Sequence, residues 1–203
     1  MRRRAFLKDV ALLAAAGYLT SRESSSSAAE SQPFGGFKLG AISDGFSQDF
    51  EQALQIMKSY GLSWVEIRAV WGKYNTEVTP EQISRIRGLL DQYGFKCSVV
   101  DSALYKCVLP GTTPVSQEGE PYPYSGQIDL LKRASDRAHA WGTDKVRGFT
   151  FWRVAQPDAI YSRISEELAK AAEVAKGQGV RLVIEDEEAC NGGTGTNSPA
   201  SSR

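Results

Sequence analysis

The sequence has few of the side chains that most metal and redox sites use. It holds one histidine, His139, and three cysteines in 203 residues, and no two cysteines form a CxxC pair. This pattern excludes zinc-ribbon and thioredoxin-like sites, and it argues against a catalytic triad built on a strand-end histidine. Neither sign of charge is in excess, since 24 lysines and arginines balance 24 acidic residues. No nucleic-acid or anionic-membrane partner is expected, because such partners normally need a basic surplus.

The sequence also lacks an apolar run long enough to cross a bilayer, which takes roughly 20 residues. Its apolar stretch Val10–Leu19 follows a group of arginines. Residues Arg3–Lys8 read RRAFLK and resemble the twin-arginine export signal, with Ser27–Ala29 as a candidate cleavage site. We therefore predict that residues 1–32 are a signal peptide and linker. The mature protein would be periplasmic or extracellular and would keep no stable membrane span. A basic amphipathic helix is the alternative.

From Phe37 onward, short apolar runs alternate with segments of helical periodicity. The predicted strands are 37–43, 64–68, 96–101, 145–151 and 180–185. The predicted helices are 48–60, 80–93, 126–141 and 157–176, with Thr79 and Ser125 as N-caps and Gly94 and Gly142 as helix ends. Strands that alternate with helices of this length are typical of a parallel sheet covered by helices.

We predict an α/β fold in which residues 33–190 form part of a (β/α)8 TIM barrel, with about five parallel strands and four covering helices. A barrel is favoured over an open doubly wound sheet because Asp44–Ser47 follows the first strand, where a glycine-rich phosphate loop would stand. A complete barrel needs roughly 250 residues, so the chain is predicted to be truncated, with open sheet edges that could self-associate. Residues 191–203 are predicted to be a disordered tail. A genuine small α/β domain is the alternative.

Glu185 is the main candidate for chemistry. It ends an apolar strand and begins an acidic cluster, so its carboxylate should face the mouth of a barrel from a rigid element. A carboxylate placed there can bind a hard divalent cation, Mn²⁺ or Mg²⁺, or act as a general base beside a polarised carbonyl. The alternatives are a partner for a helix dipole and a solvated acidic turn.

Four stretches together resemble the sugar phosphate isomerase/epimerase family, which shares the xylose isomerase-like barrel with endonuclease IV. They are the export signal, Trp64–Arg68 (WVEIR), Ser102–Gly111 and Arg181–Glu187 (RLVIEDE). The resemblance implies a divalent metal held by carboxylates and a histidine, and proton transfer between metal-bound glutamates. Glu185 matches the first of these glutamates, whereas the other ligands would come from later strands. Glu187 stands where many members carry histidine or asparagine. The multi-histidine zinc cluster of the endonuclease branch is absent.

Further candidates for contacts with a small carbohydrate lie at or after the predicted strands. Glu66 and Arg68 either pair with each other or touch substrate. Lys106 either binds a hydroxyl or phosphate group or is a solvated lysine. Trp152 and Arg153 form either a wall for sugar stacking or a core tryptophan beside a surface arginine.

These observations predict a divalent-metal-dependent sugar isomerase or epimerase-like protein that is incomplete, with low metal occupancy and weak or no activity. An exported carbohydrate-binding protein without catalysis is the alternative, and a gene remnant without function is a third reading. His139 is predicted to lie within a helix, away from any strand end.

Overall fold

The computed structural model describes residues 37–115 and 122–192. The predicted signal peptide and linker lie outside this range. The chain divides after residue 38, and all the secondary structure described below belongs to the second unit, which begins at residue 39. Among the described helices, none is both long enough and apolar enough to span a membrane.

The second unit alternates strands with helices, as predicted. Its main strands are β1 (Gly40–Ile42), β2 (Trp64–Ile67), β5 (Lys96–Leu104), β6 (Lys145–Gly148) and β7 (Arg181–Ile184). Its helices are α2 (Phe50–Ser59), α3 (Pro80–Tyr93), α4 (Gln127–Trp141) and α5 (Tyr161–Gly177). Periodicity did not predict the small antiparallel hairpin of β3 (Ala69–Val70) and β4 (Lys73–Tyr74), because strands of two residues are too short to show an alternation.

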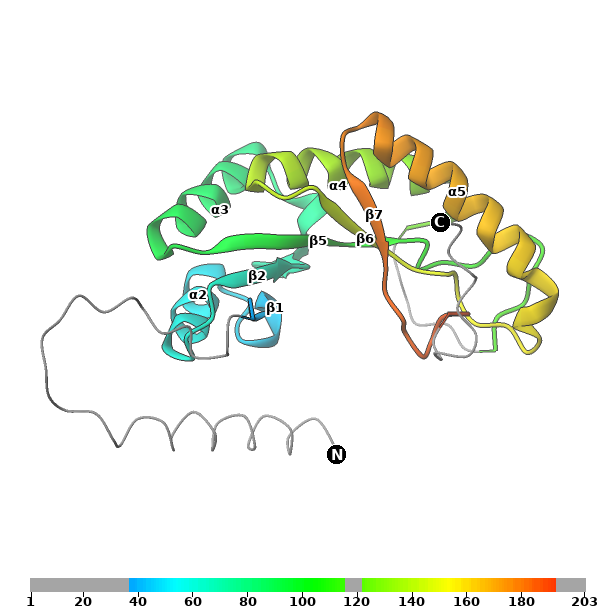
Figure 1. Ribbon diagram of the computed structural model, residues 1–203, viewed down its shortest axis with the longest axis horizontal. Coiled ribbons are helices and arrows are strands. Elements are labelled where there is room, and N and C mark those ends of the chain that lie inside the picture. The colour runs from blue at the N-terminus through cyan, green and yellow to red at the C-terminus, as the bar shows by residue number, and fades with distance from the viewer. Residues whose placement is uncertain (1–36, 116–121, 193–203) are drawn as a thin grey trace, which may run out of the picture. The chain divides into compact units, whose positions relative to one another are not determined.

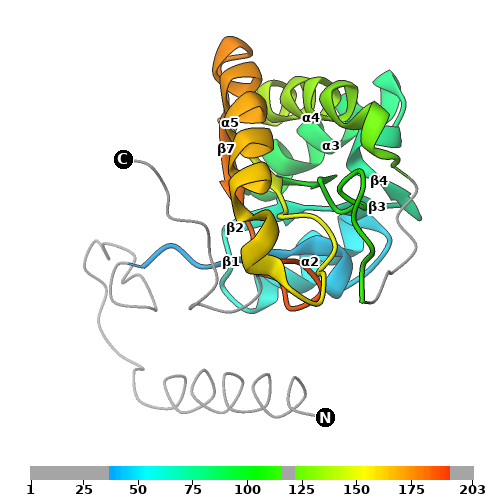
Figure 2. The same cartoon turned by 90° about the vertical axis from the view of Figure 1, so that its right-hand side faces the viewer.

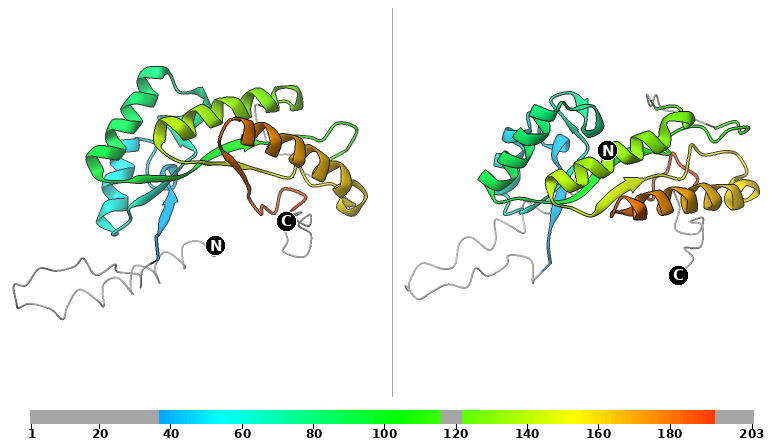
Figure 3. Two further views of the ribbon diagram at one scale, coloured as in Figure 1. Left: turned by 45° about the horizontal axis from the view of Figure 1, so that its top comes forward. Right: turned by 90° about the horizontal axis from the view of Figure 1, so that it is seen from above.

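The main strands form one sheet in the order β1-β2-β5-β6-β7, and every neighbouring pair is parallel. Spatial order therefore follows chain order, without the reversal that defines a doubly wound sheet. All four helices share one apolar cluster with the strands, so they cover the same face of the sheet. Figure 1 shows α3, α4 and α5 along that face, Figure 2 shows α5 beside β7, and Figure 3 shows α4 next to α5. The protein therefore has an α/β fold that is part of a TIM barrel, with five parallel strands and four helices.

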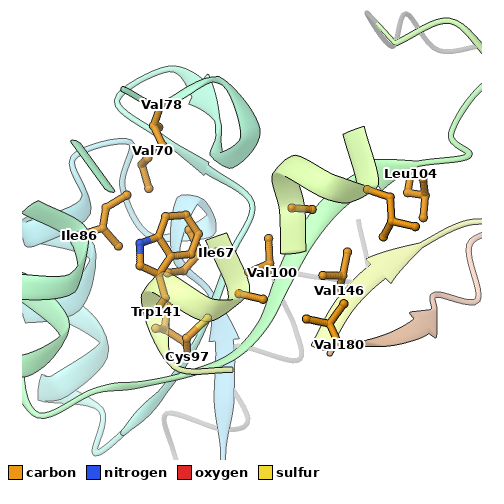
Figure 4. Packing of buried hydrophobic residues seen from close by; sticks show 14 of the residues in the cluster. Ile67, Val70, Val78, Ile86, Cys97, Val100, Leu104, Trp141, Val146 and Val180 are labelled. Carbon is orange, nitrogen blue, oxygen red and sulfur yellow. The ribbon is translucent and has the colours of Figure 1, made fainter. Parts of the chain in front are cut away.

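The main core lies between the sheet and these helices. β2 contributes Val65 and Ile67, which are fully buried. Figure 4 shows Trp141, the last residue of α4, in the same cluster beside Ile67 and Cys97. Because side chains alternate between the two faces of a strand, the residues between these core positions point to the opposite face.

Local signals set the ends of the helices. α3 begins after Thr79, whose hydroxyl accepts from the Gln82 backbone N–H while the Gln82 side chain accepts from the Thr79 backbone N–H. Gly94 and Gly142 follow α3 and α4 in the left-handed region, at φ 73° and 77°, which glycine adopts without strain. The prediction that Ser125 caps α4 is wrong. Ser125 lies within a short 3-10 turn, and α4 begins without a side-chain cap.

The predicted tail includes two residues that the fold holds firmly. Asn191 is fully buried, and its side-chain amide donates to the backbone oxygens of Thr150, Phe151 and Trp152 at 2.9, 3.2 and 3.0 Å. The Gly192 backbone N–H donates to the Thr150 hydroxyl at 2.6 Å. The packed chain therefore continues to residue 192, and residues 193–203 lie outside the described range.

Candidate functional site

Charged side chains gather on the sheet face opposite the helices. Glu66 on β2, Asp101 on β5 and Arg147 on β6 alternate with core residues of their strands, and Glu185 directly follows β7. These four side chains line a pocket of about 210 Å³ together with apolar residues from the strands. Within the described residues no helix contributes to its lining. The structure thus brings Glu66 and Glu185, two of the predicted site residues, into one pocket.

Arg147 lies at the centre of this pocket. Its Nη1 atom is 2.5 Å from Oε2 of Glu185 and 3.2 Å from Oδ2 of Asp101. The strand order explains why Arg147 contacts both carboxylates. β6 lies between β5 and β7, so Arg147 has Asp101 on one side and Glu185 on the other. Asp101 is completely buried, and among the described residues no N–H group donates a hydrogen bond to either of its carboxyl oxygens, while the carboxyl of Glu66 lies within hydrogen-bonding reach. The buried carboxylate of Asp101 therefore depends on the charge of Arg147.

Burial is the main influence on the acidic groups of the pocket. It raises the pKa of Asp101 to about 7; Arg147 acts in the opposite direction, and Glu66 and Glu185 add to the rise. Burial also raises the pKa of Glu66, against the charge of Arg147. A carboxyl group with a raised pKa stays protonated up to a higher pH. In the protonated form it can donate a hydrogen bond or act as a general acid.

The raised pKa of Asp101 predicts that stability falls as the pH rises through one window. The carboxyl titrates near 3.8 when unperturbed and near about 7 in the fold, so between these values the folded chain holds more protons than the unfolded chain. Its stabilising contribution is complete below the lower value and is lost as the pH rises through the higher one. We expect the free energy of unfolding in urea to decrease from about pH 4 to about pH 7, and Asp101→Asn to flatten this slope.

The matched control is Asp91→Asn, which changes an exposed carboxylate on α3. This variant should keep the slope of the unaltered protein. A slope that Asp101→Asn leaves unchanged would show that Asp101 does not titrate in this window.

Arg68 pairs with Asp44 rather than with Glu66. Its Nε and Nη2 atoms donate to Oδ2 of Asp44 at 3.0 and 2.7 Å. Asp44 follows β1 and Arg68 follows β2, so the pair joins the ends of two neighbouring strands. The reading in which Arg68 pairs with Glu66 is wrong, because the Arg68 guanidinium donates to Asp44 at the end of the neighbouring strand. A contact of either residue with substrate stays a prediction.

Lys106 is held by contacts next to the strand ends. Its Nζ atom lies 3.0 Å from Oε1 of Glu187, and 4.9 and 5.6 Å from the ring centroids of Phe149 and Trp152. The side chain is 14% exposed, so it is not a solvated lysine. Glu187, where the family resemblance implied a histidine or asparagine, is therefore the ionic partner of Lys106. Binding of a sugar by Lys106 stays a prediction.

Trp152 and Arg153 lie in a small second core after β6. Trp152 is 1% exposed and packs with Phe149 and Cys190, so its ring offers no open face for sugar stacking in this conformation. Arg153 is half-buried, and its Nε atom donates to the backbone oxygen of Glu188 at 2.8 Å. Trp152 is therefore a core tryptophan in this structure. A role of Trp152 or Arg153 in binding stays a prediction.

Arg147 and Asn75 are important residues that the sequence analysis missed. Asn75 is fully buried, and its side-chain amide donates to the backbone oxygens of Ile67, Arg68 and Asp101 at 2.8, 3.1 and 2.9 Å. It thereby ties the end of β2 to β5. Arg147 had a detectable signal, since it is a charged residue inside an apolar strand. Asn75 had no signal in the sequence, because its partners are backbone oxygens, which no pattern of side chains reveals.

The histidine and the cysteines do not join the pocket. His139 lies within α4, as predicted. Cys97, Cys107 and Cys190 are buried free thiols, and burial raises the pKa of each to about 12, so none is a thiolate near neutral pH. Over residues 37–115 and 122–192, no group of three His, Cys, Asp or Glu side chains is placed to hold a metal ion.

A larger pocket lies at the other end of the strands. It has a volume of about 590 Å³ and is lined by Trp64, Arg87, Lys96 and Trp141 among others. Trp64 and Lys96 are the first residues of β2 and β5, so this pocket is at the amino edge of the sheet. The chemistry of parallel barrels is concentrated at the carboxyl edge. We therefore assign the candidate site to the smaller pocket around Arg147.

Comparison with known proteins agrees with this architecture. The model of the xylose isomerase-like TIM barrel family matches residues 54–200. The chain belongs to the xylose isomerase-like TIM barrel family. No match was found among proteins of curated function. The family assignment is consistent with the parallel sheet, the chain-order arrangement of its strands and the acidic residue after β7.

Solved structures with the same fold include sugar isomerases and epimerases. A xylose isomerase-like protein from Mycobacterium smegmatis in complex with magnesium has a TM-score of 0.55 and 13% identity, with 80% of this chain and 59% of that one covered. D-allulose 3-epimerase from Methylomonas sp. in complex with D-allulose has a TM-score of 0.52 and 15% identity over 74% and 51% of the two chains. A sugar phosphate isomerase/epimerase from Parabacteroides distasonis has a TM-score of 0.50 and 20% identity over 81% and 54%. The chain thus spans 51–59% of the length of these structures, and identities this low show the fold alone.

Proposed function

We propose that this protein is a sugar isomerase or epimerase-like protein that takes a small carbohydrate at the pocket around Arg147. The proposal is supported most by one observation: a member of the xylose isomerase-like family places Glu66, Asp101 and Glu185 around a single pocket on its parallel sheet. The buried carboxyl groups can donate hydrogen bonds to sugar hydroxyls when protonated, and Glu185 can accept a proton from a carbon next to a carbonyl.

The described residues do not fit a complete metal site. Glu185 is the predicted ligand, yet one of its oxygens contacts Arg147, and no trio of ligating side chains is found over the described ranges. A single carboxylate does not hold Mn²⁺ or Mg²⁺ tightly, because these ions need several oxygen ligands. We therefore propose that the chain alone is weakly active or inactive, with low metal occupancy.

Exchange of a substrate proton with solvent tests the proposed function. We expect D-allulose incubated with the full chain in D2O, with and without Mn²⁺, to gain deuterium slowly or not at all as measured by NMR. Any exchange should fall to the uncatalysed rate in Glu185→Gln and should persist in Glu173→Gln, which changes an exposed glutamate on α5. Rapid turnover by the unaltered chain would contradict the proposed weak activity. Exchange that Glu185→Gln does not reduce would contradict the role of Glu185.

Non-catalytic carbohydrate binding is the second candidate, favoured by the missing metal ligands among the described residues. It predicts that sugar binding, measured by saturation-transfer NMR, persists in EDTA and in Glu185→Ala. Sugar binding that is lost under both conditions would exclude this candidate.

We also propose that residues 1–32 direct export and that the edge strands β1 and β7 allow self-association. The RRAFLK motif supports export. Self-association is supported by the position of β1 and β7 at the two edges of the described sheet, since unpaired edge strands present free backbone groups to other chains.

A further inference from the structure

The guanidinium of Arg147 lies between two carboxylates of the pocket. One nitrogen, Nη1, contacts both Oε2 of Glu185 at 2.5 Å and Oδ2 of Asp101 at 3.2 Å. The carboxylates thus converge on a single point from two strands. A divalent ion at the position of Nη1 would reach Oε2 of Glu185, since its bonds to carboxylates are about 2.0 to 2.6 Å long. It would lie too far from Oδ2 of Asp101 to bond it without a shift of that side chain.

Arg147 is fixed in this position by its surroundings. It is 8% exposed, and its guanidinium lies 4.9 Å from the ring centroid of Phe149, which is itself buried. The register of the sheet places Arg147 opposite Val183 on β7, two residues before Glu185. A side chain held by a ring, two carboxylates and the sheet is not free to swing out of the pocket.

Asp101 gives an independent reason to expect a permanent cation here. Its side chain is completely buried, over the described residues no N–H group donates a hydrogen bond to either carboxyl oxygen, and its near neighbour Glu66 is another carboxyl group. Burying an ionised carboxylate is costly unless a positive charge lies beside it. Arginine keeps its charge at every pH at which proteins are folded, so it supplies that charge constantly.

We propose that Arg147 is the resident cation of this pocket: its guanidinium pairs with both Asp101 and Glu185 and excludes divalent metal ions from them. The positive charge of the pocket is then supplied by the chain itself, in contrast to an acidic pocket that is empty until an ion binds. This proposal does not depend on the proposed function, because it concerns charge and metal binding whether or not a sugar is processed.

Titration with Mn²⁺ followed by EPR at about pH 8 tests the proposal. Arg147→Met keeps a long apolar side chain and removes the charge. We expect it to bind Mn²⁺ at least about tenfold more tightly than the unaltered protein, because Asp101 and Glu185 then lose the guanidinium that contacts both of them. The added affinity should disappear in Arg147→Met combined with Glu185→Gln. Arg181→Met, which removes an exposed arginine paired with Asp144, should change nothing.

The proposal is overturned if the unaltered protein binds Mn²⁺ as tightly as Arg147→Met does. A second measurement keeps the test decisive if Arg147→Met does not fold. We expect the melting temperature of the unaltered protein to be the same in EDTA and in Mn²⁺, and Glu185→Gln to lower it in both. A melting temperature that drops in EDTA would show that a bound ion, rather than Arg147, neutralises the pocket.

Discussion

Replacing Trp141 with alanine is expected to lower the free energy of unfolding by about 3–5 kcal/mol. Trp141 is 2% exposed and ends α4 within the main core, and its ring nitrogen donates to the backbone oxygen of Ile83 on α3 at 3.3 Å. The change removes a large apolar surface, leaves a cavity and frees a carbonyl that had a donor. It therefore weakens the packing of α3 and α4 on the sheet at once. Urea unfolding followed by circular dichroism measures the loss.

The matched control is Tyr60→Ala, which removes an aromatic ring that is 54% exposed at the end of α2. We expect this control to change the stability by less than about 1 kcal/mol. A loss of similar size in both variants would mean that Trp141 is not a core residue.

Replacing Asn75 with aspartate is expected to cost about 3 kcal/mol or more, although the two side chains have nearly the same shape. The amide of Asn75 donates to three backbone oxygens, those of Ile67, Arg68 and Asp101. An aspartate would turn this donor into an acceptor that faces three other acceptors in a fully buried position. All three bonds would be lost, and the carboxylate would be repelled by the oxygens that the amide had bound.

Guanidinium unfolding of the variant provides the measurement. Gln178→Glu makes the same amide-to-carboxylate change at an exposed position after α5 and should be close to neutral. If Asn75→Asp were equally harmless, the tie between β2 and β5 would not contribute to stability.

Elements with local signals were predicted well. The helix predicted over 80–93 has those bounds in the structure, because Thr79, Pro80 and Gly94 specify its two ends within the segment itself. The strand predicted over 96–101 continues to Leu104 in β5. Its last residues gain their extended conformation from pairing with β6, as in the register of Leu104 with Gly148, and no local pattern encodes that pairing.

The candidate site was predicted only in part. Glu66 and Glu185 follow the alternation and the ends of apolar strands, so their pocket could be anticipated from one segment at a time. The contact of Arg147 with Glu185 could not, because it depends on β6 lying next to β7. The same holds for Arg68, whose partner Asp44 belongs to the neighbouring strand end.

The arrangement of the sheet in chain order also bears on how the protein folds. Each strand pairs only with strands of the preceding and following βα units, so each new strand finds its neighbour already in place. The loop that must close at each step is one crossover long, and its entropic cost is nearly the same from step to step. A sheet of this kind can grow from the amino-terminal end during synthesis and does not have to wait for a distant segment of the chain.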